Sequence, residues 1–383
     1  MTKPIFLVFL LLTLISCQSR SQQTGTKRPA TAPAALVGGG CDGCEIMFIG
    51  MPDKIASADT SLGWRDANTK LVVSGTVYQN DGRTPAADVI IYYWQTDEQG
   101  FYSKNAELKG AAIRHGARRG WLKTGTDGKY TLSTNRPAPY PSRDMAAHIH
   151  LAIKEPNIAD EYYVDELVFD DDPLLTTAKR KAPENRGGSG VLRPREANGI
   201  LRAEHDIILG LHIPNYPENK ANNSETGLFI GEESPSFTPY HAWGPDRGSK
   251  ACPVCKYGRN LGILYFVKKT DRMEEMKKWL SFLEKLSQEK GDQLKVYMIM
   301  EAGDEWAKTK QVLERLGCEL DIRRLALTMV PSFQDEASEV NPNRIDPEAA
   351  STFIVYKGRV IIDTYENLEP NEADFRELTR KLR

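Results

Sequence analysis

Residues 60–215 consist largely of short runs rich in valine, isoleucine, tyrosine and threonine, separated by turn residues. The runs at 71–77 and 88–94 are examples, and the turn sequence Asn80-Asp81-Gly82 stands between them. β-Branched and aromatic residues pack well on a pleated sheet, whereas Asn, Asp and Gly favour tight turns. Because no helical pattern of useful length interrupts these runs, we expect a β-sandwich or barrel here. Further strands are expected at 129–133, 148–154, 164–169 and 206–213, and a long loop at 176–199.

The chain changes character after this region, and its 383 residues leave room for a second domain. Residues 216–250 are rich in Pro, Asn, Ser and Gly, and we expect a linker. Residues 251–383 alternate between strand-like and helix-like stretches, which is typical of a smaller α/β domain. Its strands are expected at 263–267, 294–300, 326–330, 352–356 and 360–364, and its helices at 273–290, 305–316 and from about 371 onward. The sequence therefore predicts a mainly β chain, with a β-sandwich followed by a smaller α/β domain.

The first 17 residues have the pattern of an export signal. Lys3 provides a positive charge, and the apolar run at 5–15 is too short to span a bilayer. The run ends in Leu14-Ile15-Ser16-Cys17, which resembles the lipobox of bacterial lipoproteins, so we expect a lipid on Cys17. The alternative is an ordinary secretory signal with a chance cysteine, and both interpretations export the protein. We expect anchoring to a bacterial membrane, facing the periplasm, and residues 18–59 are expected to comprise a flexible tether, at 18–35, and a Cys-x-x-Cys segment.

The charge of the chain is nearly balanced, with 50 basic and 52 acidic residues. Nucleic-acid binding requires clustered positive charge to neutralise phosphates, and no such excess is present. The sequence therefore predicts no nucleic-acid partner.

Four cysteines form two Cys-x-x-Cys pairs, Cys41 with Cys44 and Cys252 with Cys255. In an exported protein such pairs are expected to form local disulfides. A shared four-cysteine zinc site is the alternative, although a whole domain separates the pairs. The remaining Cys318 is expected to be a buried thiol on a helix.

An His-x-His pair, His148 and His150, lies in one of the expected strands. Residues two apart on a strand point to the same face, so both imidazoles can reach one metal ion. Taken alone, the pair is weak evidence for a metal, because a strand histidine is more often a structural residue. The remaining histidines have no companions at metal-ligand spacing and are expected to be structural: His115, His205, His212 and His241. His115 lies in a basic loop with Arg114, which could instead line the mouth of a pocket.

Four motifs occur in a fixed order around the pair: residues 94–102, 124–130, 136–141 and 147–150. This series resembles the catalytic domain of the intradiol ring-cleavage dioxygenases, over about residues 70–215. The resemblance implies that Tyr102 and Tyr140 are tyrosinate ligands and His148 and His150 imidazole ligands of one non-haem Fe(III) ion. Two phenolates and two imidazoles are a donor set that favours ferric iron. The implied reaction opens a catechol-type aromatic diol between its hydroxyl-bearing carbons with molecular oxygen, as in the catabolism of aromatic compounds, and the tyrosinate at Tyr140 takes a substrate proton.

The chain departs from the family pattern at three positions. Met145 stands where the family carries a pocket arginine, and Arg143 is the candidate to replace that charge as a catalytic residue. Ser142 replaces a tryptophan, and Glu166 stands near the position of an expected glutamine. Iron binding is therefore better supported than turnover of a standard catechol.

The second domain resembles a thioredoxin fold, chiefly through residues 352–361. In thioredoxins the cysteine pair follows the first strand, whereas Cys252 and Cys255 precede the strand expected at 263–267. Ser351 also replaces the family's proline. We therefore expect a structural disulfide, with a redox role for the pair as the alternative.

Two other functions compete with the dioxygenase hypothesis. One is a non-catalytic β-sandwich binding module, in which the lost arginine marks lost catalysis. The other is a thiol-disulfide redox lipoprotein acting through its C-terminal domain.

Overall fold

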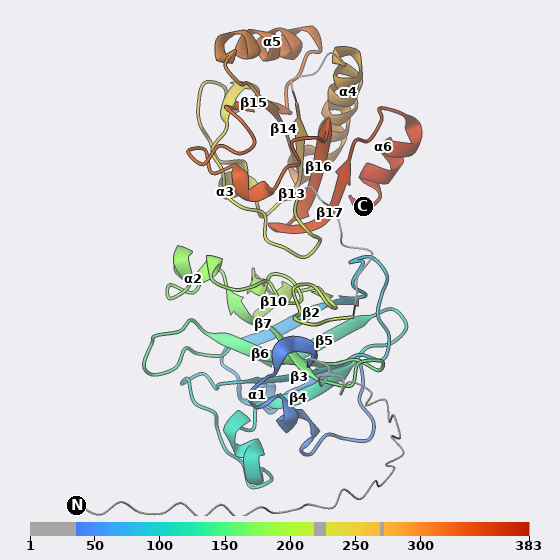
Figure 1. Ribbon diagram of the computed structural model, residues 1–383. Helices are drawn as coiled ribbons and strands as arrows, with labels where there is room; N and C mark the ends of the chain where they lie inside the picture. Colours follow the sequence, from blue (N-terminus) through green and yellow to red (C-terminus); the bar gives the residue numbers. More distant parts are fainter. Residues whose placement is uncertain (1–35, 218–226, 269–271, 383) are drawn as a thin grey trace, which may run out of the picture. The chain divides into compact units, whose positions relative to one another are not determined.

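The computed structural model describes residues 36–217, 227–268 and 272–382 (Figure 1). The expected fold class is confirmed: a mainly β region is followed by an α/β region. The signal sequence and the lipid-anchor cysteine, Cys17, lie outside the described residues. Among the described residues, none of the helices combines the length and apolar character needed to cross a membrane.

Two sheets form the N-terminal β region. The first has the order β1-β5-β2-β10-β9, with β11 paired to β2, and the second has the order β4-β3-β6-β7-β8. The strands of the first sheet are β1 (Ala58–Thr60), β2 (Lys70–Tyr78), β5 (Lys129–Asn135), β9 (Arg195–Ala197), β10 (Ile200–Glu204) and β11 (Ile207–Ile208). Those of the second are β3 (Ile90–Gln95), β4 (Arg119–Lys123), β6 (His148–Lys154), β7 (Tyr162–Phe169) and β8 (Val191–Leu192).

Alternation along the strands separates a packed core from a second face. Ile149, Leu151 and Ile153 of β6 are buried in the same apolar cluster as Leu71 of β2 and Ile91 of β3. Successive strand residues point to opposite faces of a sheet. His148 and His150 therefore project away from this core, on the other face of β6.

That other face is partly covered by the segment around the first disulfide. Cys44 and Met47 are buried against Tyr92, Trp94 and Ala152 in a separate small cluster. The segment includes the 3-10 turns η1 (Val37–Gly39) and η2 (Cys44–Phe48). The Cys-x-x-Cys segment before the sandwich is thus packed against it, and the tether expected at 18–35 lies outside the described residues.

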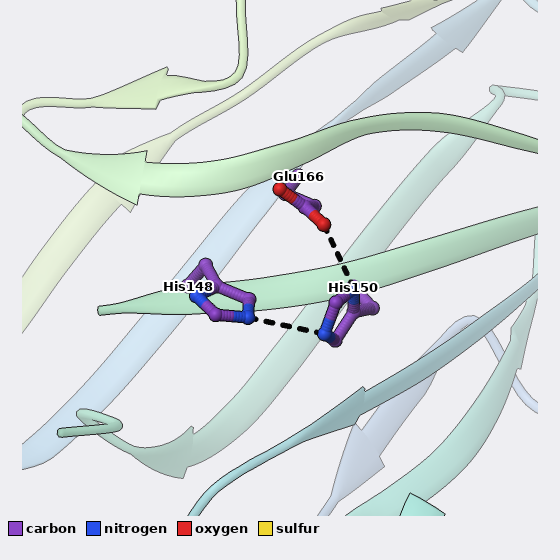
Figure 2. A group of neighbouring side chains, drawn as sticks. All are labelled: His148, His150 and Glu166. Atoms are coloured by element: carbon purple, nitrogen blue, oxygen red, sulfur yellow. Dashed lines mark hydrogen bonds and ion pairs between the residues drawn. The ribbon is translucent and has the colours of Figure 1, made fainter. Parts of the chain in front are cut away.

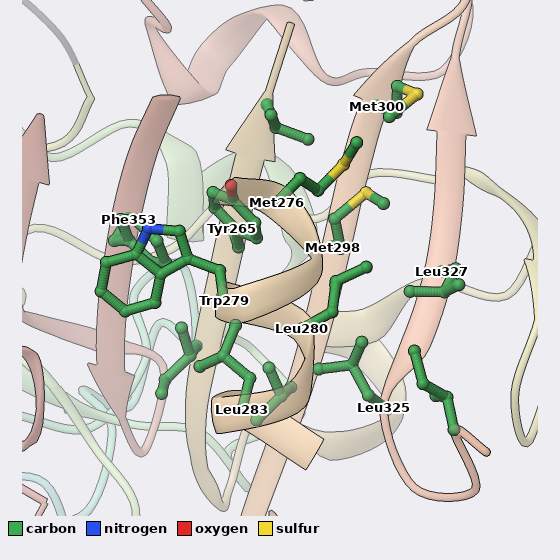
Figure 3. Packing of buried hydrophobic residues seen from close by; sticks show 14 of the residues in the cluster. Tyr265, Met276, Trp279, Leu280, Leu283, Met298, Met300, Leu325, Leu327 and Phe353 are labelled. Atoms are coloured by element: carbon green, nitrogen blue, oxygen red, sulfur yellow. The ribbon is translucent and has the colours of Figure 1, made fainter. Parts of the chain in front are cut away.

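The C-terminal region contains one sheet with the order β12-β15-β14-β13-β16-β17. Its strands are β12 (Tyr240–Trp243), β13 (Leu261–Val267), β14 (Leu294–Glu301), β15 (Ala326–Val330), β16 (Ser351–Lys357) and β17 (Val360–Glu366). The helices are α3 (Pro253–Tyr257), α4 (Met273–Lys290), α5 (Trp306–Glu319) and α6 (Glu372–Thr379). In Figure 3, Trp279, Leu280 and Leu283 of α4 pack on the sheet against residues such as Met298 and Phe353. The thioredoxin resemblance of this region stays a prediction.

The remaining short elements lie in the connections. They are α1 (Leu62–Asp66), η3 (Gly110–His115), α2 (Thr177–Lys181), η4 (Gly291–Gln293) and η5 (Asn341–Asn343).

Several expectations need correction. The expected linker at 216–250 contains β12, which pairs antiparallel with β15, so the C-terminal sheet begins earlier than expected. The expected strand at 206–213 is limited to β11, since a turn follows it. The loop at 176–199 includes α2, β8 and β9. Cys318 lies on α5 as expected but is exposed, because it falls on the solvent side of that helix.

Candidate metal centre

His148 and His150 project from the same face of β6, and their Nε2 atoms lie 3.1 Å apart (Figure 2). Their rings meet nearly at right angles, at an interplanar angle of 87°. His148 is almost fully buried, whereas His150 is partly accessible. The two nitrogens are thus placed to bind one ion, as the strand periodicity predicted.

Two tyrosines from loops bring their hydroxyl groups to the same point. The Tyr102 oxygen lies 2.7 Å from the Tyr140 oxygen and 2.9 Å from His150 Nε2. The Tyr140 oxygen lies 3.0 Å from His148 Nε2 and 3.4 Å from His150 Nε2. The structure therefore brings together all four side chains that the sequence singled out.

A network around Asp97 holds the loop that carries Tyr102. The Asp97 carboxylate accepts hydrogen bonds from the backbone N–H groups of Gln99 and Phe101 and from the Ser103 hydroxyl. The Asp97 carbonyl accepts the N–H of Ala138, in the loop that carries Tyr140. The two tyrosine loops are therefore hydrogen-bonded to each other.

Gly100 allows the closest approach of these two loops. Its φ is 87°, a conformation that favours glycine, and a Cβ atom there would lie 2.1 Å from the carbonyl oxygen of Pro139. The spacing between Tyr102 and Tyr140 thus depends on a residue that bears no side chain.

Both histidines are oriented through their second ring nitrogen. His148 Nδ1 donates to the Ala146 carbonyl at 2.8 Å, and His150 Nδ1 lies 3.1 Å from Glu166 Oε1. Such partners fix the ring orientation and leave Nε2 free as the metal-binding atom. Glu166 forms a possible metal-binding group with the two histidines. Because its carboxylate is engaged with Nδ1, on the far side of the ring, we assign it as a partner of His150.

Burial sets the protonation of these groups when no cation is present. Burial raises the pKa of Tyr102 well above the usual tyrosine range, raises that of Tyr140 as well, and lowers the pKa of His148. The hydrogen bond from His150 lowers the pKa of the Glu166 carboxyl. The His148 imidazole is therefore favoured in its neutral form, and the phenols need a cation to replace their protons.

An aromatic stack supports His150 from behind. Trp94 stands directly opposite His150 across the β3–β6 pair, and their rings stack at 4.7 Å. His115 stacks on the other side of Trp94 at 4.1 Å, and its Nδ1 is hydrogen-bonded to the hydroxyl of Tyr92. Burial lowers the pKa of His115 to about 3, so this ring is neutral. Sequence analysis missed Trp94, although its position opposite an expected ligand follows from strand pairing.

A cavity of about 420 Å³ opens beside the cluster. Its lining includes three residues of the cluster, Tyr102, Tyr140 and His150, together with Arg114, His115, Cys41 and Asp42. Arg114 forms an exposed ion pair with Asp42 at 3.2 Å. The basic loop that the sequence placed either at a pocket mouth or in solvent thus contributes Arg114 and His115 to the cavity wall.

Arg143 is not brought to this site. Its side chain is exposed, its φ is 54°, and it lines neither the cavity just described nor the hollow bordered by Met145, His148 and Glu166. The tight turn after Tyr140, in which the Arg143 N–H bonds the Tyr140 carbonyl, directs this side chain outward.

The two predicted disulfides are present, Cys41–Cys44 and Cys252–Cys255. The first lies beside the cavity, and the second lies at the start of α3, before β13. Because each pair is closed within itself, the shared zinc site is excluded.

Comparison with known proteins points to one family. Residues 53–198 match the family model described as "Dioxygenase". A curated relative, catechol 1,2-dioxygenase 1 of Acinetobacter lwoffii, is 26% identical over 187 residues, which cover 43% of this chain and 53% of the relative. The chain thus spans about half the length of that relative.

Two solved structures are similar to part of the chain. The dioxygenase domain of a dioxygenase carbohydrate-binding protein fusion from Streptomyces sp. SirexAA-E is 26% identical, with 41% of this chain and 90% of that chain covered and a TM-score of 0.30. Hydroxyquinol 1,2-dioxygenase from Pseudomonas putida DLL-E4 is 21% identical, with 42% and 62% covered and a TM-score of 0.32.

Proposed function

We propose, from the match of residues 53–198 to the dioxygenase family model and from the similarity to a catechol 1,2-dioxygenase, that this chain is an Fe(III)-dependent intradiol dioxygenase acting on a catechol-type aromatic diol. The diol ring is opened between its two hydroxyl-bearing carbons, and both atoms of molecular oxygen enter the product. The observation that carries the proposal is the convergence of Tyr102, Tyr140, His148 and His150 on one point.

The spacing of the four donor atoms fits a single metal ion. Oxygen and nitrogen ligands lie about 2.0–2.2 Å from a small ion such as zinc, so neighbouring ligands are about 2.8–3.6 Å apart. The hydrogen-bond distances within the cluster run from 2.7 to 3.4 Å. Two phenol oxygens, which become anionic on binding, favour a hard trivalent ion such as Fe(III) over softer metals.

The residues of the chain have distinct parts in the proposed reaction. Bound iron supplies a Lewis acid that orients the diol and activates it toward oxygen. Tyr140 is held by its loop and by contacts with Tyr102, His148 and His150, and its oxygen is placed to take a proton from the incoming diol. His148 and His150 keep their positions through Ala146 and Glu166.

The substrate is recognised differently from the family pattern. Met145 replaces the usual pocket arginine, and Arg143 faces solvent. Arg114 is the cation that lines the cavity beside Tyr102 and Tyr140, so we assign it the contact with a polar group on the substrate.

We also propose that the chain is exported and anchored by a lipid on Cys17. The two disulfides support export, because such bonds persist in oxidising compartments. The closed Cys252–Cys255 bond and the pairing of Lys256 with Asp246 support a structural role for the second disulfide. Neither the binding-module nor the redox-lipoprotein alternative has a comparable observation in its favour.

The test is the visible spectrum and iron content of the full-length chain purified in detergent. We expect about one iron per chain and a tyrosinate-to-iron absorption band that moves when catechol is added. Tyr140→Phe should change the band, whereas the matched control Tyr78→Phe, on β2 outside the cluster, should not. A chain that stays colourless and iron-free after reconstitution refutes the proposal.

A further inference from the structure

We propose that Glu166 is a positioning residue that strengthens His150 as an iron ligand and thereby holds the iron in its ferric form. This inference rests on the proposed function and names a residue that tunes the same site. It follows from the irregular pairing of β6 with β7, from the Glu166–His150 contact, and from the difference between a carboxylate and an amide at this position.

A β-bulge aims Glu166 at His150. Ile149 pairs with Leu167 and Leu151 pairs with Val164, so His150 alone stands opposite both Asp165 and Glu166. A bulge of this kind redirects one side chain and is common beside active sites. Without the extra residue on β7, regular pairing would place one residue, and not two, opposite His150. The bulge therefore accounts for the approach of Glu166 Oε1 to within 3.1 Å of His150 Nδ1 (Figure 2).

The contact fixes which nitrogen of His150 carries the proton. A carboxylate only accepts hydrogen bonds, so the proton must sit on Nδ1 and the lone pair on Nε2. Nε2 is the atom that faces Tyr102 at 2.9 Å and His148 Nε2 at 3.1 Å. A glutamine at this position would accept the same bond through its carbonyl oxygen but would bring no charge.

The negative charge changes the electronic character of the ligand. A carboxylate that draws the Nδ1 proton toward itself makes the imidazole a stronger electron donor. A stronger donor stabilises the more highly charged oxidation state of the metal. Together with the two tyrosinates, Glu166 thus favours Fe(III) over Fe(II) in a site where Met145 has replaced a cationic side chain.

Three full-length variants test the inference: Glu166→Gln, Glu166→Ala and, as a matched control, Asp165→Asn. The control removes one carboxylate charge from the neighbouring residue of the same bulge, whose Oδ2 atom lacks a hydrogen-bond partner among the described residues. Each chain is loaded with Fe(III), and two quantities are measured: the affinity for iron, by competition with nitrilotriacetate, and the wavelength of the tyrosinate-to-iron band.

We expect Glu166→Ala to weaken iron binding by about 10- to 100-fold, the usual cost of losing such a partner. Glu166→Gln keeps the hydrogen bond and should lose less affinity, but its band should move to longer wavelength, because a more electron-poor iron lowers the charge-transfer energy. Asp165→Asn should match the wild type in both measurements. Circular dichroism checks that each variant is folded, and Glu166→Gln provides the test if Glu166→Ala is not.

The outcomes separate this inference from the proposed function. A coloured, iron-loaded wild type whose Glu166 variants are unchanged overturns the role of Glu166 alone. An equal shift in Asp165→Asn overturns it too, because the effect would then be a general one of charge. A wild type that takes up no iron overturns the proposed function and this inference with it.

Discussion

Replacing Gly100 by alanine should dismantle the metal centre without touching any of its four donor atoms. The new Cβ would lie 2.1 Å from the Pro139 carbonyl oxygen, and real contacts are rarely below 3.0 Å, so the two loops must separate by about 1 Å. The same separation added to the 2.7 Å between the Tyr102 and Tyr140 oxygens would prevent both from binding one ion. Left-handed strain costs about 1–2 kcal/mol and overpacking about 1–3 kcal/mol, so the free energy of unfolding should fall by about 2–5 kcal/mol.

Gly110→Ala is the matched control for this prediction. Its φ is 57°, but a Cβ there meets no atom within 4 Å, so only the strain of about 1–2 kcal/mol applies. Iron content, the visible band and thermal unfolding are measured for both variants. Gly110→Ala should keep its iron, whereas Gly100→Ala should lose it and should melt at a lower temperature. Normal iron binding by Gly100→Ala, or equal loss in both variants, refutes the argument from loop spacing.

Three further predictions concern other parts of the chain. Burial lowers the pKa of His205 to about 4, whereas its pKa in the unfolded chain is about 6.5. As the pH falls, the unfolded chain therefore binds this proton first. Up to about 3 kcal/mol of the stability present above pH 6.5 is lost by the time the pH reaches about 4. Urea unfolding of the wild type and of His205→Gln across this range should show a difference that depends on pH, and a constant difference contradicts the assignment. Arg114→Gln should raise KM for the diol by about tenfold with little change in kcat, whereas Arg143→Gln should alter neither; the reverse result would restore Arg143 to the pocket. Cys17→Ser should abolish metabolic labelling by a radioactive fatty acid and release the protein from membranes, and retained labelling would exclude Cys17 as the anchor.

The sandwich, and the face of β6 on which His148 and His150 lie, could be predicted because both follow from alternation along strands. On β6, Ile149, Leu151 and Ile153 supply core residues, and the two histidines necessarily point the other way. The convergence of Tyr102 and Tyr140 with them came only from the family resemblance. Loop conformation depends on contacts such as those of Asp97, which no local pattern reveals.

Other features could not be predicted because they depend on pairing between distant segments. The bulge opposite His150 is a property of the β6–β7 register, and the sequence of either strand alone fits regular pairing. Strand β12 lies in a polar, proline-containing stretch and is fixed by its pairing with β15. The inward orientation expected for Arg143 failed because the turn after Tyr140 points that side chain to solvent.

The two faces of the β3–β6 pair explain how one sheet combines a stable core with a site built on side chains from several segments. The core face carries Ile91 and Ile149, and the opposite face carries Trp94 and His150 in direct pairing. Substitution on the site face therefore changes ligands, stacking or charge and leaves the sandwich core intact. The rigid strands fix the two imidazoles, and the hydrogen-bonded loops fix the two phenols. Tyr140, the residue that takes a substrate proton in the proposed reaction, thus lies on a loop, where a shift of its side chain requires no change in the sheet.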